Sequence, residues 1–214
     1  MSATTNEPGG DGWLALPLPD ADIRYAQAWL RKDEADAWFE RLLHDIPWER
    51  HRLKLFGREV DCPRLSCWIG DPGAAYVYSQ TRFEPHPWTP ALQSLRERVQ
   101  ASCGASFNSV LANLYRNGED SMGWHSDDEP ELGPQPVIAS LSLGVERRFR
   151  LRRKSLREAK AKPLGLPLAH GSLLYVAGDT QSHYQHDLPK LAGLSGARIN
   201  LTFRFIHGSA QRRP

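Results

Sequence analysis

The sequence has little of several things that would define its class. Its 214 residues include three cysteines, and an odd number at no metal-ligand spacing argues for reduced thiols rather than disulfides. Apolar runs are short, such as Leu173 to Ala177, far below the roughly 20 residues that a bilayer span needs. The first residues are small, polar and acidic, unlike a secretory signal. These absences predict a cytoplasmic protein (nuclear in a eukaryote) that does not enter a membrane.

The net charge of +2 is small, but the charges are unevenly distributed. The stretch Glu146 to Lys162 holds nine Lys or Arg against two Glu. Such a cluster could contact phosphates of a nucleic acid, or it could be a solvated hairpin. Conversely, Glu119 to Glu131 holds six acids and no Lys or Arg around a histidine, which suggests a cation site.

Two helices are expected in the first half of the chain. The segment Asp20 to His44 has a helical pattern, with Asp20 or Asp22 able to cap it and Pro47 preventing its continuation. A second helix begins at Pro90, because Thr89 can cap it and Gly104 follows its last apolar residue. Residues 1–19 are rich in Gly, Pro and acids and are expected to form a flexible arm, leaving 20–214 as a single domain.

The rest of the chain consists of short β-like segments separated by turn residues. They are Leu65 to Ile69, Ala75 to Ser79, Phe107 to Tyr115, Val137 to Leu143, Phe149 to Arg153, Ser172 to Val176 and Arg198 to Ile206. Helices early and strands late, without βαβ alternation, predict an α+β or mainly β fold. The expected architecture is a β-sandwich or jelly roll with helices on one face.

One candidate metal site stands out. His125 and Asp127 form an H-x-D pair, and residues two apart on an extended strand point to the same side. A later histidine, His186, would complete two histidines and one carboxylate. That set matches the facial triad of non-haem Fe(II) oxygenases, although a hydrolytic zinc site uses the same ligand types.

The strand Arg198 to Arg204 favours the interpretation of this site as that of an oxygenase. Its polar residues alternate with apolar ones, so one face carries Arg198, Asn200, Thr202 and Arg204. Two inward arginines require anions, and a dicarboxylate cosubstrate offers one carboxylate to each. Asn113 and Tyr115 repeat the alternation on another strand. The alternative is a polar network that satisfies the inside of a barrel.

The ordered motifs resemble those of the AlkB-type Fe(II)/2-oxoglutarate demethylases. They are Asn113-Leu114-Tyr115, Gly123-Trp124-His125-Ser126-Asp127-Asp128-Glu129, His186-Asp187-Leu188-Pro189 and Arg198 to Arg204. Upstream, Leu55-Phe56-Gly57-Arg58, Pro63-Arg64, Gly70-Asp71 and Tyr76-Val77-Tyr78-Ser79 resemble the nucleotide-recognition lid of members that repair double-stranded DNA. The resemblance covers roughly residues 50–206.

The resemblance implies a double-stranded β-helix, or jelly roll, with flanking N-terminal helices. The lid and a supporting helix would fall at about 50–100 and the β-helix core at 105–206. His125, Asp127 and His186 would bind Fe(II), with 2-oxoglutarate and O₂ as cosubstrates. Residues implied in cosubstrate binding are Asn113, Tyr115, Arg198, Asn200, Thr202 and Arg204. Those implied in substrate binding are Phe56, Arg64, Tyr76, Tyr78, Ser79, Asp128 and Glu129.

The implied reaction is oxidative demethylation of N-alkylated DNA bases, such as 1-methyladenine and 3-methylcytosine, by a monomeric enzyme. Tyr78 would stack on the extruded base, and Phe56 would enter the duplex in its place. Leu65, Cys67 and Trp68 depart from the lid pattern, which leaves the substrate preference open. Alternatives are an RNA demethylase, a catalytically silent nucleic-acid binding module, and an oxygenase acting on protein or a small molecule.

Overall fold

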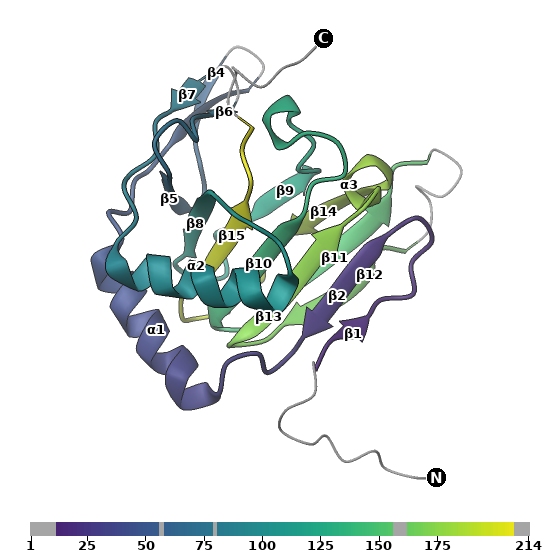
Figure 1. The fold of residues 1–214 in the computed structure, drawn as a ribbon, viewed down its shortest axis with the longest axis horizontal. Helices are drawn as coiled ribbons and strands as arrows, with labels where there is room; N and C mark the ends of the chain where they lie inside the picture. The colour runs from purple at the N-terminus through teal and green to yellow at the C-terminus, as the bar shows by residue number, and fades with distance from the viewer. Residues whose placement is uncertain (1–11, 56–57, 79–80, 156–161, 208–214) are drawn as a thin grey trace.

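The computed structural model describes residues 12–55, 58–78, 81–155 and 162–207, and the side chains of 53–60 and 76–83 are outside this description. Two antiparallel sheets face each other (Figure 1). The larger sheet has the order β1 (Leu14–Ala15), β2 (Asp22–Ala26), β13 (Ser172–Ala177), β10 (Ile138–Gly144), β15 (Arg198–Arg204), β8 (Ser109–Tyr115) and β5 (Leu65–Gly70). The smaller sheet has the order β12 (Leu164–Leu168), β11 (Arg147–Arg153), β14 (Tyr184–Leu188) and β9 (Met122–His125).

Two separate hairpins and two long helices complete the described fold. The hairpins are β3 (Arg52–Leu55) with β4 (Arg58–Asp61) and β6 (Tyr76–Tyr78) with β7 (Thr81–Phe83). Both long helices, α1 (Lys32–Asp45) and α2 (Pro90–Cys103), cover the same face of the larger sheet (Figure 1). This confirms the mainly β jelly roll with helices on one face. Among the described helices, none combines the length and apolar character needed to cross a membrane.

Strand β15 separates the core from the cavity. Its apolar residues Ile199, Leu201 and Phe203 are fully buried and pack with α1 and α2 in the main core. Because side chains alternate along a strand, its polar residues point the other way, between the two sheets. The alternation read from the sequence is therefore confirmed.

Helix α2 has the predicted boundaries. The Thr89 hydroxyl accepts a hydrogen bond from the backbone N–H of Leu92 at 3.2 Å, and Pro90 is the first helical residue. Gly104 ends the helix at φ +61°, a left-handed conformation that glycine adopts without steric cost. These signals lie within the helix and its flanking residues, so the sequence contains them all.

The helix expected from Asp20 is wrong at its start. Residues Asp22–Ala26 form β2, and only Lys32–Asp45 are helical. Ile23 and Tyr25 are buried while Arg24 between them is exposed, which is a strand period. Ile23 lies opposite Val176 of β13, so pairing with a distant strand overrides the local helical pattern.

The described part of the expected N-terminal arm is attached to the larger sheet. Leu14 and Ala15 pair with β2, and the N–H of Leu16 donates to the carbonyl of Ile23 at 2.9 Å. Leu16 and Leu18 also pack against the second core, which lies between the sheets. Residues 12–19 are therefore held by contacts. The division into an arm and one domain stays a prediction.

Candidate active site

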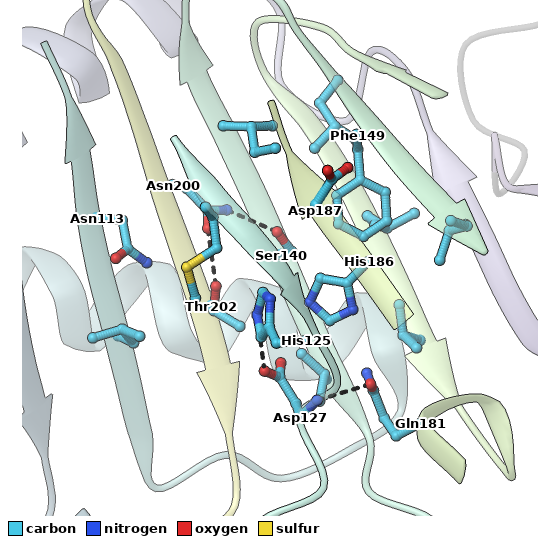
Figure 2. A pocket seen from close by; sticks show the side chains of 18 of the residues that line it. Asn113, His125, Asp127, Ser140, Phe149, Gln181, His186, Asp187, Asn200 and Thr202 are labelled. Carbon is cyan, nitrogen blue, oxygen red and sulfur yellow. Dashed lines mark hydrogen bonds and ion pairs between the residues drawn. The ribbon is translucent and has the colours of Figure 1, made fainter. Parts of the chain in front are cut away.

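A cavity between the two sheets brings the candidate residues together (Figure 2). Strands β9 and β14 of the smaller sheet supply one polar wall, and β8, β10 and β15 of the larger sheet supply the other. Most of the remaining lining is apolar and includes Phe149, Leu151, Leu168, Leu174 and Val176. Polar groups that converge in a largely apolar cavity are typical of a site for a small molecule.

His125, Asp127 and His186 meet at one end of this cavity. His125 is the last residue of β9 and lies opposite His186 of β14, so antiparallel pairing brings two histidines that are distant in sequence together. Their ring centroids are 4.2 Å apart. The potential ligand atoms of all three residues lie within 4.8 Å of one another. The tertiary structure therefore assembles two histidines and one carboxylate as one donor set.

Hydrogen bonds orient two of these donors. The Nδ1 of His125 lies 2.8 Å from the carbonyl of Gly123 and, because a carbonyl only accepts, Nδ1 is the donor; in the neutral form of the ring the lone pair is then on Nε2. Nε2 faces Oδ1 of Asp127 at 3.6 Å. The other carboxylate oxygen, Oδ2, accepts a hydrogen bond from Nη2 of Arg204 at 2.8 Å. Nε2 of His125 and Oδ1 of Asp127 thus remain available and face each other.

The backbone of Asp127 is held as well. Its N–H donates to the side-chain oxygen of Gln181 at 3.0 Å (Figure 2). The hydroxyl of the preceding Ser126 donates to the carbonyl of Tyr184 at 2.8 Å. Gln181 lies in the short helix α3 (Thr180–His183), directly before β14. These two bonds fasten the segment after β9 to the segment that precedes His186. The sequence offered no signal for Gln181.

The protonation states of Asp127 and His186 suit the binding of a cation. Burial alone would raise the pKa of Asp127, but the charges of Arg204, His186 and His125 outweigh it and leave that pKa below its usual range. Burial, reinforced by the charge of His125, lowers the pKa of His186 to about 3. At neutral pH the group therefore offers an ionised carboxylate and a neutral imidazole. Both are in the form that binds a metal ion.

Arg198 lies at the opposite end of the polar lining and is 2% exposed. Its Nη2 donates to the hydroxyl of Ser142 at 2.9 Å, and its guanidinium carbon lies 5.3 Å from the centroid of the Tyr115 ring. Its Nε is buried and has no hydrogen-bond partner among the described residues. Burial lowers its pKa to about 10, which leaves it charged. A buried guanidinium with an unused donor fits an incoming carboxylate.

The other polar residues of the cavity bond to one another. Asn200 donates to the hydroxyl of Ser140 at 2.7 Å and accepts from Thr202 at 3.0 Å. Asn113 accepts from Nε of Arg64 at 2.7 Å. Ser140 and Ser142 were not among the residues expected from the sequence. The alternation along β10, where these two serines share one side, was the available signal.

The expected substrate residues are only partly described. Phe56 and Ser79 lie outside the described residues, as do the side chains of Tyr76 and Tyr78. Arg64 is 7% exposed and directs its Nε into the protein toward Asn113. This nitrogen therefore bonds to a residue that lines the cavity, and a role of Arg64 in substrate binding stays a prediction.

The two acidic substrate candidates lie directly after Asp127. Asp128 forms an ion pair with Lys154 at 2.9 Å, and its side chain is largely exposed. Glu129 precedes the short 3-10 helix η1 (Pro130–Leu132) and is partly buried. Both residues lie beside the donor set, and their role in substrate binding stays a prediction.

Much of the basic stretch is engaged within the protein. Arg150 forms an ion pair with Asp187, Lys154 pairs with Asp128, and Arg153 pairs with Asp20. Arg152 donates to Gln185 and lies over the ring of Trp124, 4.2 Å from its centroid. Arg147 is 1% exposed, so the expectation that it contacts phosphate is wrong. Residues 156–161 of this stretch lie outside the described residues.

Comparison with known proteins assigns this chain to a family. Residues 22–204 match the 2OG-Fe(II) oxygenase superfamily. The chain is 43% identical over 180 residues to bovine alpha-ketoglutarate-dependent dioxygenase alkB homolog 3, covering 81% of this chain and 62% of the relative. It is 38% identical to mouse DNA oxidative demethylase ALKBH2, covering 94% of this chain and 90% of the relative.

Other similar proteins support the same family. Human DNA oxidative demethylase ALKBH2 is 37% identical over 204 residues, covering 92% of this chain and 78% of the relative. The chain spans a little under two thirds of the length of the alkB homolog 3 proteins. A solved structure titled "The structure of OsALKBH1" shares the fold at a TM-score of 0.63 and 18% identity, covering 90% of this chain and 99% of the other. This chain therefore belongs to the 2OG-Fe(II) oxygenase superfamily, among the AlkB homologues.

Proposed function

We propose that this chain is an Fe(II)/2-oxoglutarate-dependent dioxygenase that removes methyl groups from the ring nitrogens of DNA bases such as 1-methyladenine and 3-methylcytosine. The observation that carries the proposal is that one cavity contains both the His125, Asp127 and His186 donor set and the buried guanidinium of Arg198. A hydrolytic zinc site has no need of the second feature. The names of two groups of relatives, dioxygenases and DNA oxidative demethylases, support the same reaction class.

The donor set fits an iron ion. Two histidines and one carboxylate leave the opposite face of an ion open, which is the arrangement of non-haem Fe(II) oxygenases. Nε2 of His125 and Oδ1 of Asp127 would be ligands, because Gly123 and Arg204 hold the remaining polar atoms of these two side chains. Bound iron, 2-oxoglutarate and O₂ would supply the oxidation of the N-methyl group, after which formaldehyde, succinate and CO₂ are released.

The larger sheet would hold 2-oxoglutarate. Arg198 would bind the distal carboxylate with the help of Tyr115, since its Nε is buried and unused among the described residues. Arg204 would lie near the metal-chelating end, because it already contacts Asp127. Asn113, Asn200 and Thr202 would complete this wall through the hydrogen bonds described above.

The substrate base would approach from the side of His125. Its side chain is 25% exposed, whereas that of Asp127 is 7% exposed, so the donor set is open on the histidine side. A base inside a duplex cannot reach this point and must be flipped out, at a cost of a few kcal/mol. We propose that Tyr78 stacks on the flipped base, which recovers about 1 to 3 kcal/mol. Tyr76, Ser79, Asp128 and Glu129 would contact its polar edges.

The nature of the nucleic acid is part of the proposal. DNA is preferred over RNA because relatives with up to 94% coverage of this chain are named DNA oxidative demethylases. Action on duplex DNA, a monomeric state and a cytoplasmic or nuclear location are further proposals of the same kind. An RNA demethylase would use the same cavity. A silent binding module would bind nucleic acid without releasing formaldehyde.

Formaldehyde release tests the proposal directly. The substrates are one sequence containing 3-methylcytosine as single-stranded DNA, duplex DNA and RNA, each with and without Fe(II) and 2-oxoglutarate. We expect release from DNA that requires both additions. Asp127→Asn should abolish it, whereas Asp45→Asn, which changes an exposed carboxylate paired with Arg41 on α1, should not. Release from RNA alone would favour the RNA demethylase, and no release from any substrate would contradict the proposal.

A further inference from the structure

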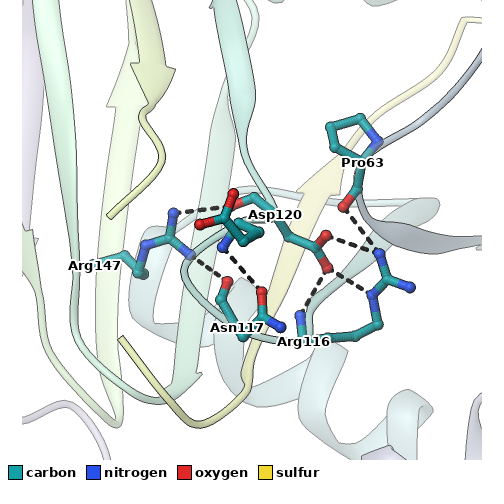
Figure 3. Close-up of polar contacts among 6 residues, drawn as sticks. Pro63, Arg116, Asn117, Asp120 and Arg147 are labelled. Atoms are coloured by element: carbon teal, nitrogen blue, oxygen red, sulfur yellow. Dashed lines mark hydrogen bonds and ion pairs between the residues drawn. The ribbon is translucent and has the colours of Figure 1, made fainter. Parts of the chain in front are cut away.

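Arg147 is one of the most deeply buried charged residues of the described chain, at 1% exposure. It begins β11, and its guanidinium is directed at the loop that carries Asn117 and Asp120 (Figure 3). It donates to the main-chain carbonyls of Asn117 at 3.1 Å, Asp120 at 2.9 Å and Pro189 at 2.7 Å. The first two carbonyls belong to the loop between β8 and β9, and the third follows β14. Arg147 thus joins the ends of strands that contribute to the cavity.

The neighbouring carboxylate is engaged by a different arginine. Asp120 accepts from Nε and Nη2 of Arg116, each at 2.8 Å, and from the backbone N–H of Arg116 at 2.9 Å (Figure 3). Arg147 reaches the carbonyl of Asp120 rather than its carboxylate. Burial lowers the pKa of Arg147, but an arginine remains charged after such a shift. Its charge is therefore solvated by carbonyl oxygens and only partly offset by Asp120.

The second buried arginine lies nearby. The guanidinium carbon of Arg147 is 5.8 Å from the ring centroid of Tyr115, and that of Arg198 is 5.3 Å from the same centroid. The charge of Arg147 contributes to the lowered pKa of Arg198, so the two groups interact. Among the described residues, no hydrogen bond joins either guanidinium to a carboxylate. Two buried like charges that share one aromatic ring create a demand for an anion at this end of the cavity.

We propose that Arg147 is a positioning residue that makes this end of the cavity selective for a cosubstrate with a distal carboxylate. The guanidinium groups of Arg147 and Arg198 both lie near the ring of Tyr115, so Arg147 helps to hold that ring beside Arg198 and adds a second positive charge. The inference rests on the proposed use of 2-oxoglutarate. It concerns the chain's preference for a dicarboxylate, which Arg198 alone would provide less strongly.

The test compares two ligands that differ only at the distal end. 2-Oxoglutarate and 2-oxopentanoate have the same chain length, but 2-oxopentanoate has a methyl group where the second carboxylate would be. Their dissociation constants are measured by titration calorimetry on the full chain loaded with Mn(II), without O₂. Arg147→Met should weaken the binding of 2-oxoglutarate about 10- to 20-fold, the effect of one charge acting over about 10 Å at an effective dielectric near 20. The dissociation constant of 2-oxopentanoate should change by less than twofold.

Two further variants separate charge from loosening of the loop. Arg147→Lys keeps the charge and should retain most of the preference for 2-oxoglutarate. Asn117→Ala removes the side-chain oxygen that accepts from the N–H of Glu119 at 2.9 Å, which loosens the same loop without changing its charge, and should leave the preference unchanged. If Arg147→Met does not fold, the neutral Arg147→Gln, which keeps an amide donor, replaces it.

The outcomes are distinct. An unchanged preference in the neutral variant, or an equal fall in Asn117→Ala, would overturn the role of Arg147. A loss in Arg147→Lys as large as that in the neutral variant would overturn it too, since the charge would then be irrelevant. If the unaltered protein fails to prefer 2-oxoglutarate over 2-oxopentanoate, the proposed function itself is contradicted.

Discussion

Replacing Arg204 with methionine should destabilise the protein strongly unless a divalent ion is present. The side chains of Arg204 and Asp127 are only 6% and 7% exposed, and their charged groups are 2.8 Å apart. Arg204→Met would leave the Asp127 carboxylate buried beside two histidines with its main counter-charge removed. Breaking a buried pair from one side typically costs about 3 to 5 kcal/mol.

The double variant separates the cost of an unpaired charge from the cost of poorer packing. Asp127→Asn in the Arg204→Met background removes the buried negative charge, so it should recover part of the stability. For comparison, Arg41→Met breaks an exposed i,i+4 pair with Asp45 on α1 and should cost less than about 1 kcal/mol.

A metal ion should replace the missing positive charge. An ion that binds only the folded state at about 100 times its dissociation constant adds about 2.7 kcal/mol. Urea unfolding of the single and double variants, with EDTA or with Mn(II), measures both effects. Mn(II) should stabilise Arg204→Met but not the double variant, which lacks the carboxylate ligand. The reasoning would be refuted if Arg204→Met lost less than about 1 kcal/mol in EDTA, or if Mn(II) stabilised both variants equally.

Three further predictions concern metal, duplex and phosphate binding. Gln181→Met should weaken Mn(II) binding about 10-fold or more, because partners that orient a ligand commonly contribute that much, and unchanged affinity in calorimetry would contradict this. Phe56→Ala should depress activity on methylated duplex DNA far more than on a single strand, since only a duplex has a gap to fill; equal losses with a lower melting temperature would make Phe56 a packing residue. Neutralising Arg152, Arg153 and Lys154 together should flatten the salt dependence of DNA binding, by about 1 in slope for each of these charges that binds a phosphate; an identical slope would mean that these charges serve only the contacts within the protein.

Local sequence determined the features whose causes lie within a few residues. The caps of α2 and the alternation of β15 are of this kind, because each depends on neighbours along the chain. The same alternation separated the core side of β15 from its cavity side. The His125, Asp127 and His186 set was also found from the sequence, since the residue types and the resemblance pointed to it, and the structure brings the three together.

Only the tertiary structure decided features that depend on pairing between distant segments. Residues Asp22–Ala26 form a strand because β13 lies beside them, although their local pattern favoured a helix. Arg147 looked like a surface charge within a basic stretch, but carbonyls 27 to 42 residues away draw it inward. Arg204 was expected to need an external anion, and the fold supplies Asp127. A charged side chain takes the partner that the packed fold places within reach, and that partner cannot be read from neighbours along the chain.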